Sequence, residues 1–79
     1  MNTGLLDKAL IGKHAFTAIV ESEGYIIGRA DYGIGGYTPM RREPTFKTYD
    51  AAQKFANGLN EKMGLTKEEA LKIVFNTMR

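Results

Sequence analysis

The sequence predicts an α+β domain in which a small three-stranded antiparallel sheet packs against two C-terminal helices, preceded by a short N-terminal helix. Two patterns lead to this prediction. Apolar residues alternate along residues 14–31, which is typical of half-buried strands, and they recur at helical spacing between residues 51 and 78. The chain of 79 residues has room for one hydrophobic core, so we treat residues 1–79 as a single domain.

The N-terminal half predicts a short helix and then a β-hairpin. Residues 5–11 carry apolar side chains at helical spacing. Period-two alternation predicts a first strand over residues 14–21 and a second over residues 25–31. Gly24 ends the tight turn between them, where a positive φ is needed.

A third strand is expected because a two-stranded hairpin is only marginally stable in water. Residues 45–48 are the best candidate, since they follow Pro44 and proline is tolerated at the edge of a sheet. The resulting element order is α–β–β–β–α–α, with both C-terminal helices covering one face of the sheet.

The two C-terminal helices carry clear end signals. Thr48 is placed to cap the first helix, and Thr66 with Glu69 forms a capping box at the start of the second. The apolar stripe of the first helix comprises Ala51, Phe55, Leu59 and Met63, widened by Ala52 and Ala56. The stripe of the second comprises Leu71, Val74, Phe75 and Met78. We interpret both stripes as core, and any part that the small sheet cannot cover as a dimer or partner interface.

Composition excludes several classes of function. The chain has no cysteine, which removes disulfides, thiolate metal sites and thiol catalysis. His14 is the only histidine and Ser22 the only serine, and no residue in sequence orients either, so we predict neither an enzyme nor a cofactor or metal. A net charge of +2 does not supply the basic stripe of a dedicated nucleic-acid binder.

Two further expectations concern location and assembly. Asp7 and Lys8 interrupt the apolar N-terminal stretch before it reaches the length of a signal peptide, so we expect a cytoplasmic protein with no membrane segment. Small domains without disulfides or metals often depend on self-association for stability. We therefore expect a homo-oligomer.

The best candidate site is the loop of residues 31–39, which holds three glycines and two tyrosines. Glycines let backbone N–H groups turn toward an anion, tyrosines offer stacking surfaces, and arginines precede and follow the loop. The candidate ligand-binding residues are Arg29, Asp31, Tyr32, Gly35, Gly36, Tyr37, Thr38, Arg41 and Arg42. The loop matches neither phosphate-binding fingerprint. The alternative, and the commoner role of such loops, is a plain connection whose tyrosines pack inward.

Three segments resemble small phage and prophage accessory proteins that have no assigned activity. They are Gly-Gly-Tyr-Thr-Pro at 35–39, Thr-Tyr-Asp-Ala at 48–51 and Gly-Leu-Thr-Lys-Glu-Glu-Ala at 64–70. The resemblance covers roughly the last two-thirds of the chain. It implies a protein of the host-cell cytoplasm that acts stoichiometrically, by occluding a host protein or by sequestering a nucleotide signal, with a role in countering host defence.

We therefore predict a small non-enzymatic binding protein of phage type, an inhibitor whose partner is a nucleotide-like ligand or a host protein. The alternative is a nucleic-acid-binding protein that uses its sheet face. In that case Arg29, Arg41, Arg42 and Lys47 would contact phosphates, and affinity would fall steeply with salt.

Overall fold

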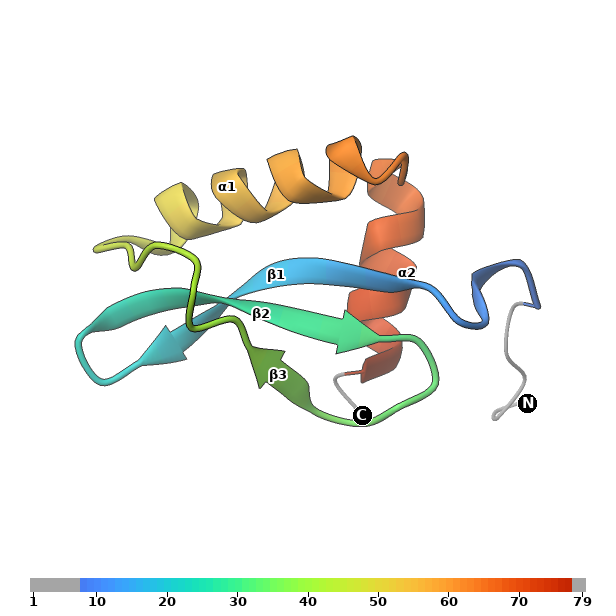
Figure 1. The fold of residues 1–79 in the computed structure, drawn as a ribbon, viewed down its shortest axis with the longest axis horizontal. Helices are drawn as coiled ribbons and strands as arrows, with labels where there is room; N and C mark the ends of the chain where they lie inside the picture. Colours follow the sequence, from blue (N-terminus) through green and yellow to red (C-terminus); the bar gives the residue numbers. More distant parts are fainter. Residues whose placement is uncertain (1–7, 78–79) are drawn as a thin grey trace.

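The computed structural model describes residues 8–77, and its elements confirm the predicted α+β class (Figure 1). A 3-10 turn, η1 (Lys8–Leu10), precedes three strands, β1 (His14–Glu21), β2 (Gly24–Asp31) and β3 (Tyr37–Pro39). Two helices follow, α1 (Tyr49–Lys62) and α2 (Lys67–Thr77). The strands form one antiparallel sheet in the order β1-β2-β3. Of the expected N-terminal helix over 5–11, residues 5–7 lie outside the described part of the chain.

The hairpin of β1 and β2 pairs along its whole length, from His14 opposite Asp31 to Glu21 opposite Gly24. Gly24 has a φ of 141°, which only glycine adopts readily. A Cβ at this position would also clash with the backbone carbonyl oxygen of Phe46. Glycine is therefore required here both by the backbone conformation of the turn and by the close approach of the Phe46 backbone.

The third strand does not lie where the sequence suggested, and the placement at residues 45–48 is wrong. β3 pairs instead with the far half of β2, with Tyr37 opposite Ala30. Phe46 makes only an isolated bridge, in which it exchanges two hydrogen bonds of 2.8 Å with Tyr25. β3 and Phe46 lie along the same edge of β2, and residues 41–45 between them do not pair with that strand. The sequence shows the local preference of each segment but not which positions of β2 remain open to it.

The two helices pack on opposite faces of the sheet, so the expectation that both cover one face is also wrong. α2 crosses behind the sheet in Figure 1, while α1 runs along β1. The α2 cluster buries Leu10, Ala15, Ala30, Leu65, Ala70 and Ile73. The α1 cluster buries Ala18, Ile27, Ala52 and Ala56, with Phe16, Phe55 and Leu59 among the half-buried side chains around it. Ala15 and Ala18 differ by an odd number of residues, and alternation along the strand sends their side chains to opposite faces.

α1 also covers the outer edge of β1, where no strand within residues 8–77 pairs with it. The Asn60 side chain pairs with both backbone groups of Phe16. It accepts a hydrogen bond from the Phe16 N–H at 2.7 Å and donates one to the Phe16 carbonyl at 3.0 Å. Gln53 Oε1 accepts from the backbone N–H of Ala18 at 3.1 Å and from the Thr17 hydroxyl at 2.9 Å. Two side-chain amides thus take the place of a fourth strand.

The buried faces of the helices match the predicted stripes only in part: Ala52 and Ala56 of the first stripe are buried, and Phe55 and Leu59 pack against them. In α1 the buried residues are Ala52, Ala56 and Asn60, whereas Ala51 and Met63 are exposed. Small side chains let the helix approach the strand closely enough for the amide contacts.

In α2 the buried residues are Ala70 and Ile73, while Val74 is half-buried. Leu71 and Phe75, which the sequence assigned to the core, remain 53% and 59% exposed. The predicted Met78 of that stripe lies outside the described residues. The exposed apolar row of α2 borders a groove.

Candidate functional site: a groove between the two helices

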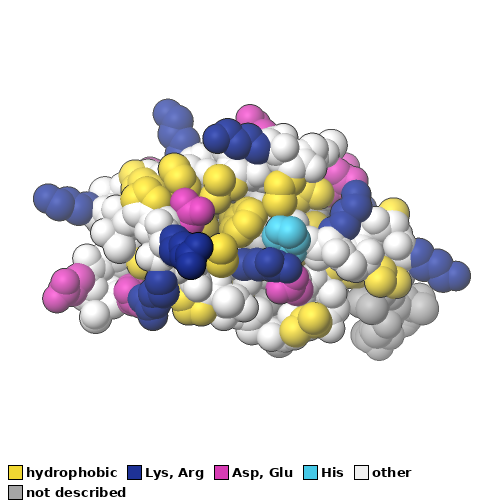
Figure 2. Space-filling view, viewed as in Figure 1, with side chains coloured by type: hydrophobic (Ala, Val, Ile, Leu, Met, Phe, Trp, Pro, Cys, Tyr) yellow, Lys and Arg dark blue, Asp and Glu magenta, His cyan; other side chains and the backbone are white. Residues whose placement is uncertain are grey.

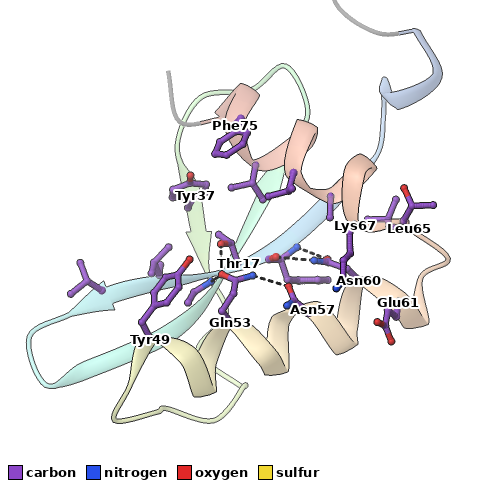
Figure 3. Close-up of a pocket in the computed structure, with 18 residues that line it drawn as sticks. Thr17, Tyr37, Tyr49, Gln53, Asn57, Asn60, Glu61, Leu65, Lys67 and Phe75 are labelled. Carbon is purple, nitrogen blue, oxygen red and sulfur yellow. Dashed lines mark hydrogen bonds between the residues drawn. The ribbon is translucent and has the colours of Figure 1, made fainter.

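A groove of about 710 Å³ lies between α1, α2 and residues 16–20 of β1 (Figure 3). We call it the corner groove, because the link between the helices closes one end of it. Thr17, Ile19 and Tyr37 from the sheet contribute to its lining. Its volume falls in the range of sites that hold small molecules, about 300–1,000 Å³.

The α1 wall of the groove is polar. Tyr49, Gln53, Asn57 and Glu61 follow one another at four-residue intervals, which places them in one row along the helix. Gln53 is oriented by the sheet, because its Oε1 accepts from the backbone N–H of Ala18. Its Nε2 therefore donates to Asn57 Oδ1, at 2.9 Å. This leaves Asn57 Nδ2 as a donor with no hydrogen bond to any described residue (Figure 3).

The α2 wall is apolar. It consists of Leu71, Val74 and Phe75, together with the buried Ala70. Val20, which is 78% exposed, also lines the groove. These side chains form an apolar surface that nothing in the described chain covers.

Two tyrosines complete the lining. Tyr49 is held by an edge-to-face contact with Tyr25, with ring centroids 5.9 Å apart. Tyr37 packs against the α2 cluster. Burial raises the pKa of the Tyr37 hydroxyl above its ordinary value of 10.0, and the proximity of Tyr49 raises it further. The Tyr37 phenol is therefore a neutral hydrogen-bonding group near pH 7.

Charge is sparse in the groove. Of the residues that line it, only Glu61 and Lys67 carry charge, one of each sign, and both are exposed. The first turn of α2 adds Glu69, whose carboxylate accepts from the backbone N–H of Thr66 at 2.9 Å. This hydrogen bond lowers the pKa of Glu69 below its ordinary value of 4.5. The N-terminus of α2 is thus already capped by an anion of the chain itself.

The structure divides the predicted loop residues between the two faces of the sheet. Arg29 lies opposite Thr38 and forms an ion pair of 3.0 Å with Asp31. Tyr37 lies one position earlier in β3, opposite Ala30, so its side chain is on the other face of the sheet, and it lines the groove. Tyr32 packs against the α2 cluster.

The remaining loop residues lie elsewhere. Gly35 and Gly36 are exposed in the connection before β3. Arg41 pairs with Glu21 at 2.6 Å, at the hairpin end of β1, and Arg42 is exposed.

Basic side chains do not form a stripe on the face opposite α2. Figure 2 shows them scattered over this face and interleaved with acidic side chains. Of the predicted ligand-binding residues, the structure brings only Tyr37 into the corner groove. A ligand role for the other eight remains a prediction.

The sequence interpretation missed Gln53, Asn57 and the exposed row of α2. A signal for the first two was present, since polar residues repeat at four-residue intervals from Tyr49 to Glu61. No such signal marked Leu71 and Phe75 as exposed.

Two general features of the described residues also bear on the site. No three histidine, aspartate or glutamate side chains within residues 8–77 come together as a metal site. Neither described helix has the length and hydropathy needed to cross a bilayer.

Comparisons with known proteins do not identify a relative. No family model matches the chain, no curated protein matches it, and no solved structure matches it. The geometry of the corner groove therefore carries the functional argument.

Proposed function

We propose that the protein is a non-enzymatic binding protein that holds a small ligand in the corner groove and acts stoichiometrically. The observation that carries this proposal is the groove itself: about 710 Å³, with hydrogen-bonding amides along one wall and exposed apolar side chains along the other. Concave sites of this size with a few oriented polar groups are typical of ligand binding. The resemblance to phage accessory proteins adds a cellular setting, sequestration of a host signal.

Sequestration is supported over catalysis by the groups that the groove offers. Its titratable side chains are Tyr37, Tyr49, Glu61 and Lys67. A general acid or base works best with a pKa near the operating pH. The pKa of Tyr37 is displaced upward, away from neutrality, and Glu61 and Lys67 are exposed near the closed end. The groove thus supplies contact and orientation but no pair matched for proton transfer.

Occlusion of a host protein is the second candidate, and the exposed Val20, Leu71 and Phe75 favour it. An apolar surface of this kind is common at partner interfaces. The nucleic-acid alternative has less support, because Arg29 and Arg41 are each bound to a carboxylate.

The test is to purify the protein from its natural host and identify bound molecules by native mass spectrometry. We expect a small-molecule adduct that is retained in an Ile34→Ser control and lost in Phe75→Ser. Both residues are exposed, at 63% and 59%, so neither change should unfold the domain, and Ile34 does not line the groove. Absence of any adduct, or equal retention in both variants, would contradict the proposal.

A further inference from the structure

We infer that the ligand of the corner groove is an uncharged planar heteroaromatic molecule with hydrogen-bond acceptors along one edge, of the nucleobase or nucleoside class. This rests on the proposed function, because it specifies what the same groove would hold. The inference is carried by three properties of the groove: the absence of an anion site, the aromatic lining, and the direction in which the amides point.

The charge distribution excludes a phosphate from the preferred ligand. Lys67 is the only cation in the lining, and Glu61 offsets it. The N-terminus of α2 attracts anions, but the carboxylate of Glu69, held in the first turn by the hydrogen bond from the Thr66 N–H, offsets this attraction. A phosphate brought into the groove would lose its hydration without gaining a compensating charge.

The aromatic lining favours a flat ring over an aliphatic chain. Tyr37, Tyr49 and Phe75 contribute to the groove from three different elements, β3, α1 and α2 (Figure 3). Stacking of a base on an aromatic side chain contributes about 1–3 kcal/mol and accepts any base. An aliphatic ligand would bury the Asn57 Nδ2 donor without satisfying it.

The direction of the amides specifies acceptors on the ligand. The backbone N–H of Ala18 can only donate, so Gln53 Oε1 faces it and Gln53 Nε2 faces Asn57. Asn57 Oδ1 must then accept, and its Nδ2 is left to donate outward. A ligand edge that satisfies this group presents a ring nitrogen or a carbonyl oxygen, as nucleobases do.

The key variant is Asn57→Asp. An aspartate keeps an oxygen for Gln53 Nε2, so the α1 wall retains its contact with the sheet, while the outward donor is replaced by an acceptor. We expect nucleoside affinity to fall by about tenfold or more, because a hydrogen bond is lost and a carboxylate faces the ligand's acceptors. Lys54→Gln, an exposed change on α1 outside the groove, is the matched control and should leave affinity unchanged.

The assay is NMR titration of ¹⁵N-labelled full-length protein with adenosine, guanosine, cytidine and uridine, each compared with its 5′-monophosphate and with hexanol. Gln53 is the only glutamine in the chain, and asparagines occur at four positions, so the side-chain amide signals are few enough to assign. The expected result is a shift of the Gln53 and Asn57 amide signals by at least one nucleoside, with no gain in affinity from the phosphate.

Tighter binding of a monophosphate would overturn the uncharged class while leaving the groove as a binding site. Binding of hexanol alone would overturn the aromatic class in the same way. If no probe shifts these amides and the native adduct survives in Phe75→Ser, the proposed function itself fails, which separates the two failures. An affinity unchanged in Asn57→Asp would refute the assigned direction of the amides.

Discussion

Asn60→Ala removes the side chain that pairs with both backbone groups of Phe16 at the outer edge of β1. Asn60 is 4% exposed, and its two hydrogen bonds measure 2.7 and 3.0 Å. The alanine variant leaves the Phe16 N–H and carbonyl facing the helix without partners. The expected loss of stability is therefore larger than that of a surface hydrogen bond.

The magnitude follows from the two orphaned groups. Each buried polar group left without a partner costs about 1–3 kcal/mol, and the half-burial of Phe16 favours the lower part of that range. We expect a loss of about 2–4 kcal/mol in the free energy of unfolding, against a total of roughly 4–12 kcal/mol for a chain of this length. The melting temperature should fall by about 8–30 °C.

Urea unfolding followed by circular dichroism measures this loss. Lys54→Ala is the matched control, since Lys54 lies on the same helix but is exposed and outside the groove, and its change should stay within about 0.5 kcal/mol. A loss below about 1 kcal/mol for Asn60→Ala, or equal losses in the two variants, would refute the assignment of Asn60 as the partner of the strand edge.

Asn60→Asp adds a test by pH. Its carboxyl can still accept from the Phe16 N–H, but it can donate to the Phe16 carbonyl only when protonated. Burial beside a carbonyl oxygen should raise the pKa of this carboxyl in the folded state. The raised pKa contributes stability that is present at pH values below the unfolded pKa and is lost as pH rises through the folded pKa. As pH rises from 4 to 7, the urea midpoint of this variant should therefore decrease relative to that of the native chain. A difference in midpoint that does not change with pH would contradict the geometry.

Substitutions at five other positions give three further predictions. Gly24→Ala should destabilise the fold by about 2–3 kcal/mol because of its positive φ and backbone clash. Gly58→Ala should stabilise the fold by about 0.5–1 kcal/mol, because the position lies within α1 and a Cβ there meets only open space. The urea midpoints of the two glycine variants measure both effects. Ile73→Ala should cost about 2–5 kcal/mol and Leu71→Ala about 0.5 or less, since only the first is buried. The reverse order would mean that the faces of α2 are misassigned. Because folding lowers the pKa of Glu69, its carboxylate stabilises the fold at pH values above the pKa of the unfolded state. This stabilisation is lost as pH falls through the pKa of the folded state. Thermal unfolding between pH 2 and 6 should therefore show a smaller loss in acid for Glu69→Gln.

Local signals were enough to predict most of the fold. Alternation gave the β1–β2 hairpin, Gly24 gave its turn, and the cap at Thr48 and the box at Thr66 gave the starts of both helices, which the hydrogen bonds confirm. The third strand was misplaced because its position depends on pairing with β2, and no local pattern records which part of β2 is free.

The faces of the helices could not be read from apolar spacing alone. A helix that packs on the edge of a sheet needs small residues for close approach and a polar residue for the strand's backbone groups. In α1, Ala56 meets the first need and belonged to the predicted stripe. Asn60 meets the second and, being polar, lies outside any apolar pattern, which extended instead to the exposed Met63. The groove could not be predicted for the same reason. Its apolar wall includes Leu71 and Phe75, and the sequence does not show that α2 exposes these residues.

The pairing of Phe16 with Asn60 also has a consequence for the order of events during synthesis. The two residues are separated by 44 positions in the chain. A ribosome that adds about 5–20 residues per second supplies Asn60 roughly 2–9 s after Phe16. Once β2 has also been made, the hairpin can form within that interval, but the outer edge of β1 is still open to pairing with another chain. The first helix thus acts late, as the element that closes a nascent sheet to its neighbours, and the domain gains this protection only when nearly the whole chain has been made.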